Sequence, residues 1–303
     1  MKKIFVTGIG GCVGHYLFDL LIANPDYDLY LLVRDPSKLL FSPGSYDNVH
    51  LIEDDLKNIS KYADIIKEMD IVIHAAADWA GHEGNLDYSL ELFNLIDPVR
   101  CQKVIYFSTA SILGENNRPV PEAETLGTHY VRGKYLLHKK LPELPIYPKM
   151  ITLFPTWVLG GDKLHPYSHA STGIIEAKKW LWLIRFFTVD AKFHFIHAAD
   201  IARITYYLLE NETKEKELVL GNPAITASQF IRQTCRYFRI PVFFQVPISL
   251  PFVILLADLT GHKLHPWDLF CFRKRHFVYK TVNASAFNLK YDRGTVQGAL
   301  NGL

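Results

Sequence analysis

The chain has 303 residues, 49% of them hydrophobic, which is enough for a substantial core and excludes a disordered chain. Its 33 basic residues nearly balance 31 acidic ones and leave a net charge of +2, so bulk charge offers no argument for nucleic-acid binding. The four cysteines have neither metal-type spacing nor the density of a disulfide framework, and we predict a cytoplasmic protein with reduced Cys12, Cys101, Cys235 and Cys271.

Apolar strands and helices alternate through the first half of the chain. A helical pattern covers 15–23 and stops at Asn24-Pro25, and strands are predicted at 3–6, 29–33, 49–52, 70–77 and 103–109. Continuous apolar strands in this repeated β-α-β order are typical of a parallel sheet with helices on both faces. The predicted fold class is therefore α/β, a Rossmann-type doubly wound parallel sheet whose ligands bind beyond the carboxyl ends of its strands.

The second half of the chain is less regular. It contains a strand that runs into a loop at 151–161, a strand followed by a helix at 193–210, and a late strand at 217–221. The remaining segments are rich in aromatic residues and proline, which predicts a smaller C-terminal substrate lobe. We therefore expect a dinucleotide-binding domain at 1–162 and a lobe at 163–303, with 193–221 returning to the first domain.

Two segments of the lobe carry side chains that suggest other partners. The run AKKWLWLIRFF (177–187) combines basic and large apolar residues; we expect a lobe helix that packs on the core and roofs the pocket, with an interfacial membrane helix as the alternative. No membrane span is predicted, because the longest apolar stretch, 246–257, is shorter than the ~18 residues that a span needs.

His165 and His169 stand four apart, but Pro166 interrupts a regular helix, so we expect loop histidines and no metal site.

The segment TGIGGCVG (7–14) follows the first strand and opens the first helix. Gly8 permits a tight turn, Gly11 lets the backbone approach a pyrophosphate, and Gly14 lets the helix pack closely on the sheet. Phosphates bind the free N–H groups at the positive end of such a helix. A glycine motif alone is a weak indicator, but its place between strand and helix favours a dinucleotide site over an ordinary turn.

The end of the second strand, Val33-Arg34-Asp35, indicates which dinucleotide binds. An acidic residue at this point usually accepts a hydrogen bond from the ribose 2′-hydroxyl of NAD, whereas an arginine favours the 2′-phosphate of NADP. Arg34, helped by Lys38, therefore favours NADP over NAD, with a solvated arginine beside Asp35 as the alternative. Asp55, at the end of the third strand, suits the adenine region.

The stretch HYVRGKYLLHK (129–139) contains two tyrosine–lysine pairs, Tyr130 with Lys134 and Tyr135 with Lys139. Residues four apart share one face of a helix. A lysine there, together with an oxidised nicotinamide, lowers the pKa of a tyrosine from its ordinary value of about 10, and the phenol then serves as acid or base near neutral pH. Spacing alone does not choose between the two pairs.

A series of short motifs runs along the chain in one order: TGxxGxxG, HAAA, STASILG, YxxxK, LFPTWVLGG and FHFIHAADIA. In this order they resemble the extended short-chain dehydrogenase/reductase family, also called the NAD-dependent epimerase/dehydratase family. The resemblance covers nearly the whole chain. The run VRDP (33–36) is similar to the cofactor segment of the branch that contains dihydroflavonol reductases and 3β-hydroxysteroid dehydrogenases.

The resemblance also implies which residues are catalytic. The family's lysine follows a small residue, which Gly133 supplies for Tyr130 and Lys134, whereas His138 stands in that place for the second pair. Tyr130 would then be the acid or base, and Lys134 would tune it and hold the cofactor ribose. Tyr135 and Lys139 are expected on a solvated helix face.

Two further catalytic residues and the cofactor contacts follow from the same resemblance. Thr109 would anchor the substrate oxygen, with Ser108 or Ser111 sharing or taking its role, and Asn85 matches the family's structural asparagine. The implied cofactor contacts are Thr7, Gly8, Gly10, Gly11, Cys12, Val13, Gly14, Arg34, Lys38, Asp55, Leu56, Ala75, Ala76, Ala77, Ser108, Tyr130, Lys134, Pro155, Thr156 and Val158.

Three functions are compatible with these residues. The first is NADP-dependent hydride transfer to or from a carbonyl or secondary alcohol of a small, apolar or ring-bearing substrate. The second is a nucleotide-sugar epimerase or dehydratase with tightly bound NAD, whose diphosphate would need basic lobe residues such as Arg185, Arg232, Arg236 and Lys263. The third is a non-catalytic NADP-binding redox sensor or assembly factor. The family often forms dimers through two helices of each subunit, which makes a homodimer a further partner to test.

Overall fold

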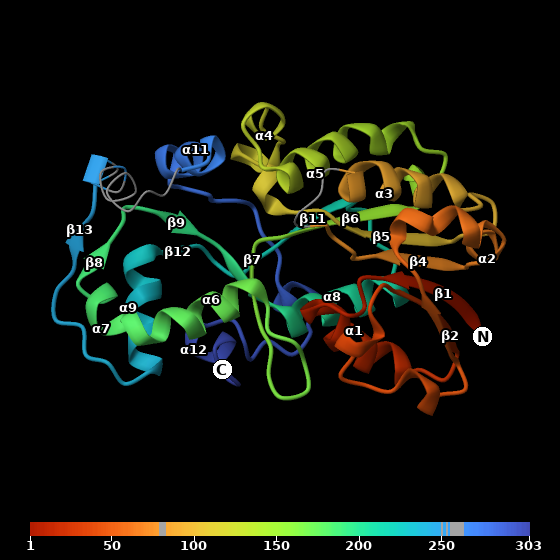
Figure 1. Cartoon of the computed structure of the whole chain (residues 1–303), viewed down its shortest axis with the longest axis horizontal. Helices are drawn as coiled ribbons and strands as arrows, with labels where there is room; N and C mark the ends of the chain where they lie inside the picture. Colours follow the sequence, from red (N-terminus) through yellow and green to blue (C-terminus); the bar gives the residue numbers. More distant parts are fainter. Residues whose placement is uncertain (79–82, 250, 253, 255–263) are drawn as a thin grey trace.

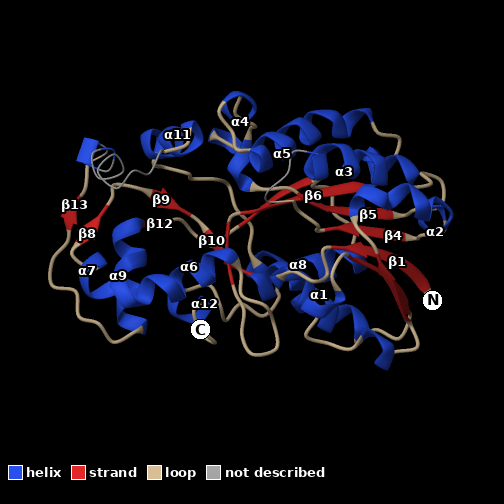
Figure 2. Ribbon diagram, viewed as in Figure 1, coloured by secondary structure: helices blue, strands red, loops and turns tan. Residues whose placement is uncertain are grey.

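The computed structural model describes residues 1–78, 83–249, 251–252, 254 and 264–303. At its centre is a seven-stranded parallel sheet in the order β11-β6-β5-β4-β1-β2-β3 (Figures 1 and 2). Its strands are β1 (Lys2–Thr7), β2 (Tyr27–Val33), β3 (Val49–Glu53), β4 (Ile71–His74), β5 (Lys103–Phe107), β6 (Met150–Pro155) and β11 (Glu217–Leu220). The order reverses at β1, which pairs with β2 on one side and β4 on the other. This is the predicted doubly wound sheet, and the ligand crevice of such a sheet lies at the reversal.

Side chains of the strands alternate between two cores, one on each face of the sheet. In β1, Ile4 and Val6 belong to one buried cluster, while Phe5 belongs to the other. In β5, Ile105 and Tyr106 divide in the same way. Successive side chains of a strand point to opposite faces, so a strand covered on both sides is apolar throughout. This is why the strands appear in the sequence as unbroken apolar runs.

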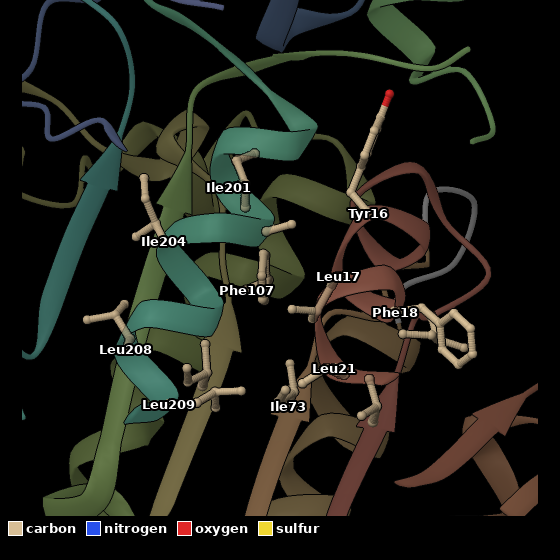
Figure 3. Packing of buried hydrophobic residues seen from close by; sticks show 14 of the residues in the cluster. Tyr16, Leu17, Phe18, Leu21, Ile73, Phe107, Ile201, Ile204, Leu208 and Leu209 are labelled. Atoms are coloured by element: carbon tan, nitrogen blue, oxygen red, sulfur yellow. The ribbon is translucent and has the colours of Figure 1, made fainter. Parts of the chain in front are cut away.

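Helices cover both faces of the sheet. The helices α1 (Cys12–Ile22) and α8 (Ala198–Glu210) pack together on one face, while α2 (Ala63–Lys67), α3 (Glu83–Leu95) and α5 (His129–Lys140) cover the other. Leu17 and Leu21 of α1 belong to the same buried cluster as Ile201 and Leu208 of α8 (Figure 3). The apolar side chains of each helix recur every three or four residues, which places them on one stripe facing the sheet.

The rest of the chain forms the lobe and its connections to the sheet. Its β10 (Phe195–His197) pairs with β7 (Trp157–Leu159), and α8 then leads back to β11 beside β6. No helix in the described ranges is both long enough and apolar enough to cross a membrane. The remaining elements are α4 (Glu122–Thr125), α6 (His169–Ala177), α7 (Leu181–Ile184), β8 (Phe187–Thr188), β9 (Lys192–Phe193), β12 (Ile225–Thr226), α9 (Ala227–Tyr237), β13 (Val246–Pro247), α11 (Pro266–Lys274) and α12 (Val296–Ala299).

The run 177–187 differs from its prediction. It is not one helix, because α6 ends at Ala177, a 3-10 turn follows at Lys178–Trp180, and α7 covers four residues before β8 begins. Leu181 is its one buried residue, and none of the run lines the cavity at the sheet's carboxyl edge. The prediction of a helix that packs on the core and roofs the pocket is therefore wrong. Its apolar residues are consecutive rather than three or four apart, so no helical stripe could bury them together.

Candidate active site

A cavity of about 1100 Å³ lies at the carboxyl ends of the parallel strands, between the sheet and the lobe. On the sheet side it is lined by the segments that follow β1, β2, β3, β4, β5 and β6. On the lobe side it is lined by residues that include Tyr167, His169, Phe193, His194, Trp267, Cys271, Phe277 and Tyr279. The position agrees with the ligand crevice of a doubly wound sheet.

Gly8 and Gly14 shape the loop between β1 and α1. Gly8 has a φ of +80°, and a Cβ there would lie 2.4 Å from backbone atoms of Ala75 and Ala76. A Cβ at Gly14 would lie 2.4 Å from the carbonyl oxygens of Gly8 and Ile9. Both distances are far below van der Waals contact, so neither position accepts a side chain without a shift of the backbone.

The start of α1 meets the cavity without a side-chain cap. Its N-cap is Gly11, which makes no side-chain hydrogen bond, and Gly10, Gly11, Cys12 and Val13 all line the cavity. The first N–H groups of a helix have no partner inside the helix, and the helix dipole is positive there. The loop therefore offers room and donors for a pyrophosphate. Burial raises the pKa of the Cys12 thiol to about 12, so this side chain is a neutral part of the wall.

A buried hydrogen-bond chain joins β1, β4 and α3 beneath the loop. Thr7 Oγ1 lies 2.7 Å from His74 Nδ1, and His74 Nε2 lies 2.9 Å from Ser89 Oγ. The Ala76 N–H donates to Thr7 Oγ1 at 3.3 Å. Burial holds the pKa of His74 well below its ordinary value, so the ring is neutral. The predicted contact Thr7 therefore lines the cavity while its hydroxyl positions Ala76.

His74 was not predicted to be a site residue. It is fully buried at the end of β4, immediately before the alanines that form the cavity wall. The signal was present in the HAAA motif, because a buried histidine at a strand end needs partners for both ring nitrogens. The strand itself is shorter than predicted, since Ala75, Ala76 and Ala77 leave the sheet and line the cavity.

Asn85 supports the wall of the cavity and does not line it. Its side-chain oxygen accepts a hydrogen bond from the Asp78 N–H at 3.0 Å, and its side-chain amide donates to the Asp78 carbonyl. Because Asn85 is 1% exposed, these bonds are shielded from water. They fix the end of the segment that carries the wall alanines, which agrees with a structural asparagine rather than a substrate contact.

Arg34 and Lys38 line the cavity, as do Asp55 and Leu56. Arg34 Nη1 is 3.8 Å from Asp55 Oδ2, and Lys38 Nζ is 3.6 Å from Asp35 Oδ2. The cationic side chains are 72% and 65% exposed, respectively. Exposed pairs at such distances are weak, so neither carboxylate holds its cation firmly.

Tyr130 and Lys134 line the same cavity as the glycine loop. They stand on α5, where the Thr128 side chain caps the helix by accepting a hydrogen bond from the Val131 N–H at 3.3 Å. Lys134 is 1% exposed, and its ammonium donates to the Phe107 carbonyl at 2.8 Å. The two predicted side chains are therefore brought to the carboxyl end of β5, where Phe107 is the last strand residue.

Thr109 lies beside Tyr130, and the two side chains share a hydrogen bond. Thr109 Oγ1 also accepts from the Ser111 N–H and donates to Ser111 Oγ, both at 3.2 Å. As the N-cap of the 3-10 turn Ala110–Ile112, Thr109 has a fixed position. Ser108 and Ser111 line the cavity as well, so all three predicted hydroxyls lie in one wall.

Burial changes the proton affinities of the tyrosine–lysine pair. It raises the pKa of Tyr130 to about 12 and lowers the pKa of Lys134 to about 7, because a dry environment disfavours both charged forms. The hydrogen bond with Thr109 lowers the pKa of Tyr130, but by less than burial raises it. The Lys134 ammonium donates to the Phe107 carbonyl. In the chain without a cofactor, burial is thus the largest influence on the pKa of Tyr130, and its lowering by Lys134 together with an oxidised nicotinamide stays a prediction.

In the second tyrosine–lysine pair, one residue is buried and the other is exposed. Tyr135 is 8% exposed and belongs to a buried cluster with Ala123 and Trp267. Lys139 is exposed, and its Nζ donates to Glu124 at 3.1 Å. The predicted solvated face is right for Lys139 and wrong for Tyr135, because α4 packs against this side of α5.

The predicted cofactor contacts Pro155 and Thr156 line the cavity at the end of β6, and Val158 of β7 lines it as well. Thr156 Oγ1 donates to the Leu220 carbonyl at 2.8 Å, so its hydroxyl ties β6 to β11. Trp157 lines the cavity too and was not predicted. Its ring centroid lies 5.6 Å from that of Phe193, which places an aromatic wall next to the strand end.

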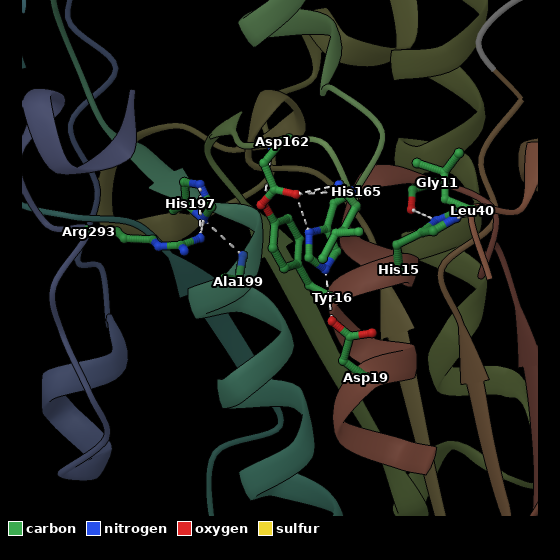
Figure 4. Close-up of polar contacts among 12 residues, drawn as sticks. Gly11, His15, Tyr16, Asp19, Leu40, Asp162, His165, His197, Ala199 and Arg293 are labelled. Carbon is green, nitrogen blue, oxygen red and sulfur yellow. Dashed lines mark hydrogen bonds and ion pairs between the residues drawn. The ribbon is translucent and has the colours of Figure 1, made fainter. Parts of the chain in front are cut away.

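Tyr16 and His165 hold the loop after β7 against α1 (Figure 4). Their rings stack with centroids 3.7 Å apart, and the Tyr16 hydroxyl donates to Asp162 at 2.9 Å. His165 Nδ1 lies 2.7 Å from Asp162 and His165 Nε2 lies 2.8 Å from Asp19 (Figure 4). Its two nitrogens thus point to different carboxylates, whereas His169 begins α6. Across the described residues, no group of His, Cys, Asp and Glu is arranged to hold a metal ion.

Comparison with known families places this geometry in context. The model of the NAD dependent epimerase/dehydratase family matches residues 4–221. The chain belongs to this family. The match extends from β1 through β11, so it includes every strand of the central sheet. Members of this epimerase/dehydratase family are NAD-dependent enzymes, which agrees with the dinucleotide-type loop and crevice.

Solved structures share the whole fold. The dTDP-glucose 4,6-dehydratase of Bacillus anthracis in complex with NAD has a TM-score of 0.69 at 14% identity, with 99% of this chain and 96% of that chain covered. The UDP-glucose 4-epimerase of Thermus thermophilus in complex with NAD has a TM-score of 0.68 at 16% identity, covering 99% and 97%. The terminal R domain of the myxalamid PKS-NRPS pathway has a TM-score of 0.68 at 16% identity, covering 99% and 90%. Similarity at these identities concerns the fold alone.

A match to one curated relative is shorter. An uncharacterized protein of Methanocaldococcus jannaschii is 26% identical over 145 residues. The aligned part is 41% of this chain and 44% of the relative, so it spans less than half of either protein. Substrate and reaction therefore have to be argued from the cavity itself.

Proposed function

We propose that this protein is an NADP-dependent oxidoreductase that transfers a hydride between the nicotinamide and a carbonyl or secondary-alcohol carbon. One observation carries the proposal: Tyr130, Thr109 and Lys134 line the same cavity as the glycine loop 7–14. A phenol beside a hydroxyl and a buried amine is a suitable proton donor and acceptor for a substrate oxygen. The substrate would be a small, apolar or ring-bearing molecule.

The residues present fit a dinucleotide. Gly8 and Gly14 keep side chains out of the loop, and the uncapped start of α1 offers N–H donors to a pyrophosphate. Arg34 and Lys38, whose side chains are largely exposed, would hold the 2′-phosphate of NADP, and Lys134 would donate to the ribose next to the nicotinamide. When bound, this cofactor supplies the hydride chemistry that side chains lack.

Tyr130 is the proposed acid and base. During reduction it gives its phenolic proton to the substrate oxygen, and during oxidation it takes the hydroxyl proton. With a pKa of about 12 it is protonated in the ligand-free chain, which is the form that a reduction needs. Positive charge brought next to the phenol lowers this pKa, so Lys134 in its charged form favours the reverse direction. Thr109 would hold the substrate oxygen beside the phenol.

The lobe side of the cavity supports an apolar substrate. Its described lining residues include Trp267, Phe277, Tyr279 and Phe193, and they include no lysine or arginine. Aromatic walls with a few polar groups bind flat or ring-bearing ligands through buried apolar area. A carbonyl near Tyr130 would be the polar end of such a molecule.

A nucleotide-sugar substrate has less support from the described residues. Arg185 donates to the Pro241 carbonyl at 2.9 Å and Arg232 to Gln245 at 3.0 Å. Neither of them lines the cavity, and Arg236 does not line it either. Lys263 lies outside the described residues. Among the described residues, none of the three arginines of this alternative is therefore placed to bind a diphosphate in the cavity.

The test begins with titration of the purified protein with NADPH and NADH, followed by a panel of carbonyl compounds monitored at the nicotinamide absorbance. We expect tighter binding of NADPH and turnover with apolar or aromatic carbonyls. Tyr130→Phe should bind the cofactor normally and lose roughly 10²- to 10⁴-fold in turnover. Tyr135→Phe, on the same helix, is the matched control and should retain turnover.

Three outcomes would contradict the proposal. A preference for NADH would refute the role given to Arg34. Tightly bound NAD after purification, without NADPH turnover, would favour an epimerase or dehydratase. Unchanged biological activity of Tyr130→Phe would favour a non-catalytic sensor or assembly factor.

A further inference from the structure

An apolar and basic surface lies at the end of the lobe opposite the central sheet (Figure 1). It is formed by residues 177–189 and 232–248, called here the lobe-end surface. The two segments lie side by side, because β8 pairs with β13 and the ring centroids of Phe186 and Phe244 are 5.2 Å apart. None of these residues lines the cavity, so the surface is separate from the proposed active site.

Large apolar side chains of the lobe-end surface are in contact with solvent. Leu181 anchors the short helix α7 with 4% exposure, and its neighbours face outward. Monomeric soluble proteins rarely expose large aromatic side chains in one contiguous area. The exposed fractions are 52% for Trp180, 58% for Trp182, 40% for Leu183, 78% for Phe243, 57% for Phe244 and 50% for Val246.

The charge of the lobe-end surface has one sign. The two segments contain no aspartate or glutamate, although the whole chain is nearly neutral at +2. Five of their six basic residues are exposed and Arg185 is partly buried. The basic residues are Lys178, Lys179, Arg185, Arg232, Arg236 and Arg239.

We propose that the lobe-end surface binds the face of a membrane that contains anionic phospholipids, without crossing it. Tryptophan and phenylalanine are favoured at the boundary between headgroups and acyl chains, and lysine and arginine are attracted to lipid phosphates. Both kinds of residue occur together on this surface. This attachment leaves the cavity free, and it does not depend on the proposed reaction.

The charge pattern disfavours a second copy of the chain as the occupant. A two-fold symmetric interface places the same patch of both subunits face to face. Here that would oppose positive charges to positive charges around Lys178, Lys179 and Arg239, and the acidic residues Glu176 and Asp190 lie only at the borders of the first segment. An anionic lipid surface supplies the missing negative charge and an apolar layer at the same time.

The test uses the full chain and two kinds of vesicle, phosphatidylcholine alone and an equimolar mixture with phosphatidylglycerol. We expect cosedimentation with the mixed vesicles that weakens at high salt, and much weaker cosedimentation with phosphatidylcholine alone. Lys178→Gln with Lys179→Gln should weaken binding to the mixed vesicles by roughly five-fold for each lysine removed. Trp182→Ser with Phe243→Ser should abolish binding to the mixed vesicles.

Matched controls separate this effect from misfolding and from catalysis. Leu164→Ser removes another exposed apolar side chain, 72% exposed and outside the surface, and should bind vesicles like the parent chain. Tyr130→Phe should also bind normally. Brominated phosphatidylglycerol should quench tryptophan fluorescence in the parent chain more strongly than in Trp180→Phe with Trp182→Phe.

Three results would overturn the proposal. One is equal binding to both kinds of vesicle. Another is unchanged binding in the lysine or aromatic variants. The third is self-association that depends on Trp182 in the absence of vesicle binding, which would make the surface an interface between copies.

Discussion

Gly8 and Gly10 lie two residues apart in one loop, yet they face different constraints. A Cβ at Gly8 would meet the backbone of Ala75 and Ala76 at 2.4 Å, and the φ of Gly8 is +80°. At Gly10 the nearest atom to a Cβ would be Leu39 Cδ2 at 3.8 Å, an ordinary contact. Position 8 therefore requires glycine, whereas position 10 does not.

This difference predicts the effect of alanine at each position. Gly8→Ala should lower the free energy of unfolding by roughly 1–3 kcal/mol, because it combines a strained φ with a backbone clash. Gly10→Ala should stay within about 0.5 kcal/mol of the parent chain. Urea denaturation of both variants provides the measurement. Equal stability of the two variants would contradict the geometry.

Burial of Lys134 affects how the free energy of unfolding depends on pH. Burial lowers its pKa to about 7 from an unfolded value of 10.5. Between these two pH values the unfolded chain holds the lysine proton and the folded chain has lost it, so the unfolded state binds more protons. The free energy of unfolding should therefore rise with pH from about 7 to 10.5 through this residue.

The contribution of Lys134 can be isolated by substitution. Lys134→Met keeps an apolar chain of similar length without a charge, so the slope of stability against pH should be shallower by at most about 1.4 kcal/mol per pH unit. Denaturation of the parent chain and the variant across this pH range, without cofactor, gives the two slopes. Identical slopes would show that folding does not shift the pKa of Lys134.

At the scale of elements, the contact between α1 and α8 joins the glycine loop to the second half of the chain. Leu17 and Leu21 of α1 and Ile201 and Leu208 of α8 belong to one buried cluster (Figure 3). The start of α1 forms the proposed pyrophosphate site, so the packing that orients this helix also orients its N–H groups. Apolar contacts between α1 and α8 therefore help to position the proposed pyrophosphate site.

Truncation of this contact should weaken the fold. Leu208 is fully buried, and Leu208→Ala should lower the free energy of unfolding by roughly 2–5 kcal/mol, since it leaves a cavity in a close-packed core. Leu164→Ala changes a side chain that is 72% exposed and should alter stability by no more than about 0.5 kcal/mol. Chemical denaturation compares the two. A small loss for Leu208→Ala would indicate that α8 contributes little to the core.

At the scale of the whole molecule, the cavity is bounded by segments far apart in the chain. Thr7 of β1 and Tyr279 near the C-terminus both line it, and the Tyr279 hydroxyl donates to the Ala110 carbonyl at 3.0 Å. A molecule that fills this cavity contacts the sheet and the lobe together. Binding should therefore stabilise the protein as a unit.

This leads to a prediction about cofactor and stability. NADPH at a hundred times its dissociation constant should raise the free energy of unfolding by about 2.7 kcal/mol. Arg34→Ala with Lys38→Ala should reduce the effect of NADPH and leave that of NADH unchanged, because only NADPH carries the 2′-phosphate. Thermal unfolding with each cofactor provides the measurement. An equal loss for both cofactors would assign these residues to a contact common to the two.

The sequence by itself determined the order of elements, the parallel sheet and the glycine loop. Its apolar runs and the TGIGGCVG motif are local patterns, which depend on strand periodicity and on the space that a single residue occupies. The tyrosine–lysine pair and its hydroxyl partner were also indicated, through motif order. Each of these motifs is encoded within a few neighbouring residues, although their order extends along the chain.

Tertiary structure alone decided what lies next to each side chain. Tyr135 is buried because α4 covers it, and His74 joins two elements because Thr7 and Ser89 contact its two ring nitrogens. Most of the run 177–187 is exposed or only partly buried, because it does not pack on the core. The pKa of Lys134 likewise reflects burial among distant segments rather than the tyrosine four residues before it. Burial and partners arise from contacts between residues far apart in the chain, and no local pattern specifies them.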